Sequence, residues 1–372
     1  MRNTFWSAGG VLDLMKSKKR KRGFIWFLLL LVSVAFTILW WMAIQFHRDY
    51  RNTPSHHLIG NRPSTVASLK EHGYPFSFIV IGDPGCSERS EELIERALKE
   101  RNSSFIVVLG DFVRKPDLWN HRFFLAEMTT EMKPFCPIFL VPGNHDIDYL
   151  SKKIKRRGRR VTPEIYESLY GPRKSDFVFN NCLFIFCDVD WRRPPDYLNY
   201  IRNVLSEKSK GRRHIFVFIH YPPGGLADYV ADALPTPKEF FSLLEAYNGC
   251  TCFFGHHHGY WRGRYKGVNL IISGGGGRLK KSQSEWGQFH HILRVTVDEN
   301  KVAEEILTIK EGGALEDRFE EWIFMNFFPM IQNKTWILNF IFVLLIITSS
   351  FLLFRICVII QKSSNGNKSD LI

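Results

Sequence analysis

The chain has 372 residues, of which 45% are hydrophobic and 23% are charged, and its formal net charge at pH 7 is +13. Long apolar segments stand near both ends, and about 235 residues remain between them, which suits one large domain and gives no sign of a second. The sequence shows no internal repeat, which excludes a repeat architecture. Two short basic runs match the whole positive excess, so the rest of the chain is close to balanced.

The first apolar segment is long enough to cross a membrane. It runs from Phe24 to Ile44 without a charged residue, and tryptophans stand near both of its ends. About 20 apolar residues cross the hydrocarbon core of a bilayer, so residues 23–46 are predicted to form a transmembrane helix. A cleavable signal peptide is the alternative, but its apolar region spans only about 7 to 15 residues, and no small-x-small cleavage site follows here. The segment therefore favours an uncleaved signal anchor.

The charges beside this segment predict its orientation. Residues 1–22 form a basic tail with six lysines and arginines between Lys16 and Arg22, which the positive-inside rule places in the cytoplasm. The middle of the chain would then be extracytoplasmic, and a second predicted transmembrane helix at residues 336–360 would return the tail at 361–372 to the cytoplasm. We therefore expect an integral membrane protein with two spans and no nucleic-acid partner, since an outward domain would rarely meet one.

The middle of the chain contains short apolar runs separated by helix-like stretches. The runs are rich in β-branched and aromatic residues and end at Gly or a polar residue, which is typical of buried strands; they cover 76–81, 105–109, 138–141, 215–219 and 251–254. Stretches with helical character lie at 88–100 and 118–132. This order predicts an α/β fold, in which ligands bind beyond the carboxyl ends of the strands.

Each of these five strands is followed by side chains that can bind a metal. The segments are Gly82-Asp83-Pro84-Gly85, Gly110-Asp111, Gly143-Asn144-His145-Asp146, His220 and Gly255-His256-His257-His258. Carboxylate and amide oxygens together with imidazole nitrogens suit Mn, Fe, Zn or similar divalent ions, and one carboxylate can bridge two of them. Asp111 is the candidate for that bridge.

The order of these motifs resembles the calcineurin-like metallophosphoesterases over roughly residues 75–310. The family's signature is D-x-H, G-D-x-x, G-N-H-D/E, a later lone His and G-H-x-H. The resemblance implies an α/β/β/α sandwich, flanked here by two transmembrane helices, and a site with two divalent metal ions. One ion would be held by Asp83, Asp111 and His258, and the other by Asp111, Asn144, His220 and His256.

The resemblance also implies roles for the two residues after Asn144. In the family, the residue that matches His145 sits over the substrate phosphate as a hydrogen-bond donor or general acid, and the residue that matches Asp146 orients it. These two residues are therefore the catalytic candidates.

Two departures from the family pattern fall on the first metal. The third residue of D-x-H is Gly85 here, and the tyrosine with which purple acid phosphatases compensate for such a glycine is replaced by Arg114. The first metal would then have three protein ligands and bind more weakly. Cys86 could supply a thiolate, or be a small buried residue, and Arg114 could clamp phosphate, or be a surface charge.

The remaining segments frame the domain. Residues 47–74 and 311–335 are expected to be linkers, and the glycine run after the strand at 268–272 is expected to form a tight loop beside the site. A second basic run between Lys152 and Arg160 follows Gly-Asn-His-Asp closely. It could steer a polyanionic substrate, rest on anionic lipid headgroups, or be a solvated loop.

The leading hypothesis is a membrane-anchored, metal-dependent phosphoester hydrolase that acts through a water activated by two metal ions. Because the domain is tethered at both ends, its phosphoester substrate could be a lipid or lipid-linked molecule. One alternative is a degenerate metallophosphoesterase fold that serves as a binding or scaffold module. Another is a membrane-tethered protein phosphatase. Specificity in such a fold lies in the loops between the motifs, so the sequence does not name the substrate.

Overall fold

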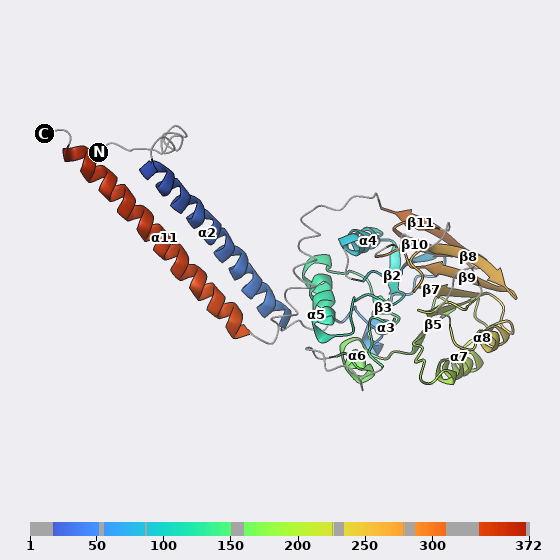
Figure 1. Cartoon of the computed structure of the whole chain (residues 1–372). Coiled ribbons are helices and arrows are strands. Elements are labelled where there is room, and N and C mark those ends of the chain that lie inside the picture. Colours follow the sequence, from blue (N-terminus) through green and yellow to red (C-terminus); the bar gives the residue numbers. More distant parts are fainter. Residues whose placement is uncertain are drawn as a thin grey trace. The chain divides into compact units, whose positions relative to one another are not determined.

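The structure is a computed structural model that describes residues 18–51, 56–85, 88–149, 160–224, 226, 234–277, 279, 287–309 and 335–369. The chain divides into two compact units (Figure 1). One consists of residues 1–52 and 330–372, and the other of residues 53–329. Cys86 and most of the basic run between Lys152 and Arg160 lie outside the described residues.

The first unit contains two long helices, α2 (Lys18–Arg51) and α11 (Thr335–Ser369). Each has an apolar stretch long enough to cross a bilayer, at Gly23–Trp41 and Asn339–Ile359. The helices pack side by side and antiparallel, because Trp41 contacts Phe342 at one end and the Arg355 guanidinium lies over the Trp26 ring at the other. Between these contacts, the hydroxyls of Ser33 and Ser349 are 2.8 Å apart, within hydrogen-bond distance.

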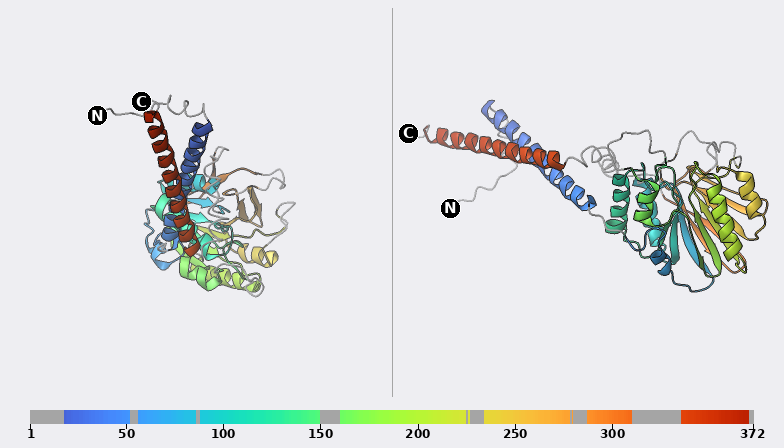
Figure 2. Two further views of the ribbon diagram at one scale, coloured as in Figure 1. Left: turned by 60° about the vertical axis from the view of Figure 1, so that its left-hand side comes forward. Right: turned by 90° about the horizontal axis from the view of Figure 1, so that it is seen from below.

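The second unit is built on two β-sheets that face each other (Figure 2). The first sheet has the strand order β11-β10-β1-β2-β3, with bounds Val302–Thr308, His291–Val297, Phe76–Ile81, Ser103–Val108 and Ile138–Leu140. The second has the order β4-β5-β6-β7-β9-β8, with bounds Ser175–Phe179, Cys182–Cys187, His214–Ile219, Cys250–Phe254, Val268–Ser273 and Tyr260–Tyr265. Strands β1, β2 and β3 are parallel to one another, and so are β5, β6, β7 and β9.

Helices cover the outer faces of both sheets, which completes the predicted α/β/β/α sandwich. The shorter helices of this unit are α3 (Pro63–Ala67), α4 (Glu88–Lys99), α5 (Leu118–Ala126), α6 (Pro163–Tyr170), α7 (Pro195–Lys208) and α8 (Pro237–Leu244). The stretch 118–132 is not one α-helix, because a π-helix, η1 (Glu127–Met132), continues from α5.

The space between the two sheets is filled mainly by phenylalanine. Phe78 and Phe105 of the first sheet stack on each other, with ring centroids 5.1 Å apart, and both meet Phe184 of the second sheet edge to face. Phe218 and Phe253 stack in the second sheet. Because a parallel strand in this sandwich is buried on both faces, its sequence is continuously apolar, which is the pattern that predicted the strands. This core fixes the edge from which the polar loops emerge.

Part of the expected linker at 47–74 belongs to the domain instead. Ile59 is fully buried and forms a β-bridge with Ile138, and the Asn61 side chain hydrogen-bonds the backbone of Leu140 in both directions. Buried polar groups need such partners. The local sequence gives no strand or long helix here, so the linker interpretation missed the several hydrogen bonds by which residues 56–69 contact β3 and α6.

Candidate metal centre

The predicted site residues lie where strands of the two sheets end. Asp83 follows β1 and Asp111 follows β2, while His220 and His256 follow β6 and β7 of the other sheet. Asn144 follows β3 by a few residues. Because these strands end at the same edge of the sandwich, five loops that are far apart in the sequence meet there.

Four of the predicted ligands surround a common point. The ligand atoms of Asp111, His220 and His256 lie within 4.8 Å of one another. The side-chain oxygen of Asn144 is 3.2 Å from His220 Nε2 and 3.0 Å from His256 Nδ1, and these two nitrogens are 3.2 Å apart. Two imidazole nitrogens, one amide oxygen and one carboxylate thus converge, a donor set that suits a divalent transition metal.

The orientation of His220 presents one particular nitrogen to this point. Its Nδ1 lies 2.7 Å from the carbonyl oxygen of Leu109, to which it donates a hydrogen bond. In the neutral ring the proton is therefore on Nδ1, and Nε2 carries the lone pair. Fixing a histidine tautomer through its other nitrogen is how proteins prepare this side chain to ligate a metal.

The electrostatics of the site favour positive charge. Burial alone would raise the pKa of Asp111, but the charge and hydrogen bond of His220 outweigh it and hold this pKa below its ordinary value. Burial lowers the pKa of His220, yet the charge of Asp111 raises it to about 10 overall. Burial also raises the pKa of Asp83, which lies close to Asp111. Crowded buried carboxylates of this kind are stabilised by a bound cation.

The ligands predicted for the other ion are arranged more loosely. His258 Nε2 is 3.9 Å from a carboxylate oxygen of Asp83, and the backbone N–H of His256 donates to both oxygens of that carboxylate. Gly85 supplies no side chain, and its backbone N–H donates to the carbonyl oxygen of Asp111. This half of the site therefore has two side chains of its own in addition to Asp111.

His145 stands at the open side of the cluster. Its side chain is 51% exposed, and its Nε2 is 3.9 Å from a carboxylate oxygen of Asp111. Its Nδ1 donates to the carbonyl oxygen of Arg114 at 2.7 Å, and its backbone N–H donates to Asp111. The exposed Nε2 thus faces the space where a substrate would meet the site.

Asp146 contacts the loops rather than His145. Its buried carboxylate accepts hydrogen bonds from the backbone N–H groups of Asp111, Val113 and Gly143, at 2.7 to 3.1 Å. The resemblance implied that Asp146 orients His145; in this structure the Nδ1 of the His145 ring donates to the Arg114 carbonyl. Asp146 connects the loop after β2 to the loop after β3. It thereby sets the positions of Asp111 and Asn144, the predicted ligands on these loops.

The backbone around the site is strained and closely packed. Asp83, Asp111 and His256 have φ values of 54°, 50° and 66°, in the left-handed region that non-glycine residues rarely adopt. Such residues cluster at functional sites, where the surrounding structure holds them in place. Position 143 requires glycine, because a Cβ there would lie 2.2 Å from a carboxylate oxygen of Asp111.

The glycine run after β9 lies beside the site, as predicted. A Cβ at Gly274 would approach a carboxylate oxygen of Asp83 to 2.9 Å, and one at Gly277 would approach the Asp83 carbonyl oxygen to 2.3 Å. The run therefore packs its backbone against the loop that carries Asp83. It supports that loop, and no Gly-Lys-Ser/Thr follows it in the sequence, which argues against a P-loop.

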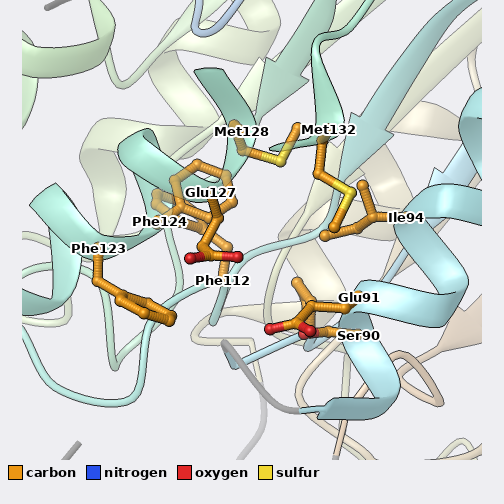
Figure 3. Close-up of a pocket in the computed structure, with 10 residues that line it drawn as sticks. Ser90, Glu91, Ile94, Phe112, Phe123, Phe124, Glu127, Met128 and Met132 are labelled. Atoms are coloured by element: carbon orange, nitrogen blue, oxygen red, sulfur yellow. The ribbon is translucent and has the colours of Figure 1, made fainter. Parts of the chain in front are cut away.

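A small apolar pocket lies behind the loops after β1 and β2 (Figure 3). Pro84 and Phe112, the neighbours of Asp83 and Asp111, line it together with residues of α4, α5 and η1. Its volume of about 20 Å³ holds little more than one water molecule. The pocket is too small for a substrate group, so a substrate would bind on the open side of the cluster.

Sequence reasoning missed a second polar cluster near this edge. Asp188 follows β5 and is buried, and its carboxylate accepts a hydrogen bond from the Tyr149 hydroxyl at 2.5 Å and pairs with Arg173. Tyr149 lies shortly after the Gly-Asn-His-Asp segment, so the cluster links that loop to the second sheet. The only signal in the sequence is an Asp after a buried strand, which does not distinguish this cluster from a turn.

Comparisons with known proteins agree with the fold. The family model described as calcineurin-like phosphoesterase matches residues 76–260. Among solved structures, a dimetal phosphatase from Danio rerio aligns with a TM-score of 0.50 and 13% identity, over 63% of this chain and 96% of that chain. A search of curated proteins found no significant match.

Two further solved structures align with lower TM-scores. Purple acid phosphatase PPD1 from seeds of yellow lupin (Lupinus luteus) has a TM-score of 0.48 and 15% identity, over 64% of this chain, which spans only 52% of the lupin chain. GAP50, the anchor in the inner membrane complex of Plasmodium, has a TM-score of 0.49 and 15% identity, over 65% of this chain and 87% of that chain.

The motifs, the two-sheet sandwich and the matched family model identify the class of protein. The chain belongs to the calcineurin-like phosphoesterase family. At such low sequence identities the solved structures support only the fold.

Proposed function

We propose that the chain is a membrane-anchored phosphoester hydrolase that depends on two divalent metal ions. The observation that carries this proposal is the convergence of Asp111, Asn144, His220 and His256, whose donor atoms come from four loops and both sheets. Side chains with these lone pairs would repel one another unless a proton or a cation lay between them. A phosphate ester with its negative charge is the substrate that such a cation site attracts.

The residues divide between two ions. Asp111, Asn144, His220 and His256 would hold one, and Asp83 and His258 would hold the other, with Asp111 shared. Bound divalent ions of the Mn, Fe or Zn type supply Lewis acidity, which lowers the pKa of water and offsets the charge of the phosphoryl group. The carbonyl of Leu109 keeps His220 in the tautomer that ligation requires.

His145 is placed to act on the leaving group. Because its Nδ1 donates to the Arg114 carbonyl, the exposed Nε2 carries the proton only when the ring is an imidazolium. In that form it can donate to a phosphate oxygen or to the departing alkoxide. Asp146 takes part as a positioning residue, through the backbone of the ligand loops.

The membrane part of the proposal rests on the helical unit. Antiparallel packing of α2 and α11 brings residues 18 and 369 toward the same end of the pair, which agrees with both termini lying in the cytoplasm. The basic tail before α2 favours that side. The domain between the helices would be extracytoplasmic and close to the bilayer, so we propose a lipid or lipid-linked phosphoester as its substrate.

A binding or scaffold module is the second candidate, and Gly85 is the observation that favours it. A glycine at this position removes one side-chain ligand from the first ion. A site that loses one ion could keep the fold and bind phosphate without turning it over.

Hydrolysis of chromogenic esters by the full-length protein tests the proposal. With Mn²⁺ present, we expect turnover of p-nitrophenyl phosphate or bis-p-nitrophenyl phosphate, and a loss of more than roughly a hundredfold in Asp111→Asn, which keeps the shape but removes the bridging charge. Asp298→Asn, an exposed change after β10, serves as the matched control and should leave turnover unchanged. Absence of turnover in the wild type, with phosphate binding retained, would support the binding module.

A further inference from the structure

Trp191 stands out among the exposed aromatic residues of the domain. Its side chain is 45% exposed, although large aromatic groups normally bury most of their surface. It lies just after β5, which is parallel to β6, so it emerges from the same edge of the sheet as His220. Tyr265 is equally exposed, at 45%, but it ends β8, which runs in the opposite direction, and its ring packs on Phe241.

A continuous series of ring contacts joins Trp191 to the metal centre. The Trp191 and Tyr221 rings meet edge to face, with centroids 5.4 Å apart and an interplanar angle of 89°. Tyr221 directly follows His220, and its ring centroid is 4.9 Å from that of His256. One molecule could therefore place a phosphate at the metal ligands and another group against these two rings.

The exposure of Trp191 is held in place by its neighbours. Arg192 forms paired hydrogen bonds with Asp190, and its guanidinium also donates to the carbonyl of Tyr149 and lies over the Tyr149 ring. The backbone N–H of Arg193 donates to the Asp190 carbonyl, which closes the turn. The residues on either side of Trp191 thus form hydrogen bonds, and the contact with Tyr221 places the Trp191 ring at the edge of the site.

We propose that Trp191 and Tyr221 form an aromatic subsite that binds a planar ring carried by the phosphoester substrate, beside the phosphate held at the metal centre. This inference rests on the proposed function, because the phosphate places the ring. It gives the proposed lipid or lipid-linked phosphoester an aryl or nucleobase group beside its phosphate.

The geometry of the two side chains suits a planar ring. Two rings at right angles present a face and an edge, and both are positions from which aromatic groups attract another aromatic ring. Stacking on exposed tryptophan is also tolerant of the identity of the ring.

The test uses two phosphonates that differ only in the planarity of the ring. Benzylphosphonate and cyclohexylmethylphosphonate carry the same charge and similar bulk, and neither can be hydrolysed at its phosphorus–carbon bond. Their affinities for the full-length, Mn²⁺-loaded protein would be measured by calorimetry. We expect benzylphosphonate to bind at least roughly fivefold more tightly.

Variants assign that preference to the subsite. Trp191→Ala should abolish the preference, Trp191→Phe should retain most of it, and Tyr265→Ala, the equally exposed control, should leave it unchanged. Equal binding of both phosphonates by the wild type, or a preference that survives Trp191→Ala, would overturn the aromatic subsite and leave the metal centre standing. Binding of neither would overturn the proposed function as well.

Discussion

The two halves of the proposed metal centre differ in how closely their side chains converge. On one side, Asn144, His220 and His256 point at a common centre with Asp111, and a backbone carbonyl fixes the His220 tautomer. On the other side, the side chains of Asp83 and His258 are 3.9 Å apart, and Gly85 adds none. The edge of this sandwich thus brings four donor groups together on one side and leaves the donor groups on the other side apart.

The smaller number of side-chain ligands beside Asp83 and His258 follows from one local feature. Gly85 has a φ of 59°, and among the described residues the nearest atom to a Cβ built there would be the carbonyl oxygen of Asp111, at 3.8 Å. In the part of the chain that the structure describes, there is therefore space for a side chain at this position. We expect the ion held by Asp83 and His258 to bind more weakly than the ion held by the other half.

Removing one histidine from each half should give the largest difference between the two halves. In His256→Ala we expect the tighter ion and more than roughly a hundredfold of hydrolytic rate to be lost, since this residue is part of the complete donor set. In His258→Ala we expect a smaller loss, on the order of tenfold, because that half is already weak. Metal content and ester hydrolysis would be measured on both variants. Equal losses in the two would show that the halves are equivalent.

Asp146→Asn should loosen both halves together. The carboxylate of Asp146 accepts three backbone hydrogen bonds, and an amide can offer only one oxygen to them, so its NH₂ group would face a donor. We expect a loss of about 1–3 kcal/mol in the free energy of unfolding. Chemical denaturation would measure it, with Asp298→Asn as the control. An unchanged stability would contradict the role of Asp146 in holding the two loops.

Gly85→His should strengthen metal binding in the weaker half of the site. The described residues leave room at this position, and histidine tolerates a positive φ better than most residues. We expect the weaker ion to bind roughly tenfold more tightly, as an added ligand would provide, while the tighter ion is unaffected. Calorimetric titration with Mn²⁺ would show the change, and Gly85→Ala controls for the effect of adding a Cβ at this backbone conformation. Tighter binding in both variants alike would contradict ligation by the new imidazole.

Domain stability should also depend on pH. Burial lowers the pKa of His121 to about 3, from an ordinary value of 6.5, and that of His291 to about 4. Below pH 6.5 the unfolded chain binds protons that the folded domain does not, so the free energy of unfolding should fall as the pH drops toward 4. Each histidine contributes a slope of at most about 1.4 kcal/mol per pH unit. The slope should diminish in His121→Gln, and an unaltered slope would contradict the assignment.

Much of the fold could be predicted from the sequence because each strand is an apolar run that ends at a polar turn. The runs at 76–81 and 251–254 correspond to β1 and β7, and the polar residues after them lie at one edge. The boundary between α5 and η1 was not visible, because an α-helix and a π-helix share a similar apolar pattern. Residues 56–69 were missed because their hydrogen bonds to β3 and α6 leave no pattern in the local sequence.

The site was predictable to the extent that its side chains are of metal-binding types. Asp111, His220 and His256 are recognisable by type and by their place after a strand. The hydrogen-bond partners of Asp146 are backbone N–H groups from other loops. Such partners cannot be predicted from residue types. The roles of Trp191 and Tyr221 could not be predicted either, since an aromatic residue after a strand is ordinary. Only the fold places Tyr221 beside His256 and Trp191 beside Tyr221.

The most direct test of the account is the number of metal ions and their relative affinities. The full-length protein would be stripped with a chelator and titrated with Mn²⁺ by calorimetry. We predict two ions, the first bound at least roughly tenfold more tightly than the second, and the loss of both binding steps in Asp111→Asn. A single binding step, no binding, or two steps that persist in Asp111→Asn would contradict a dinuclear centre that shares this carboxylate.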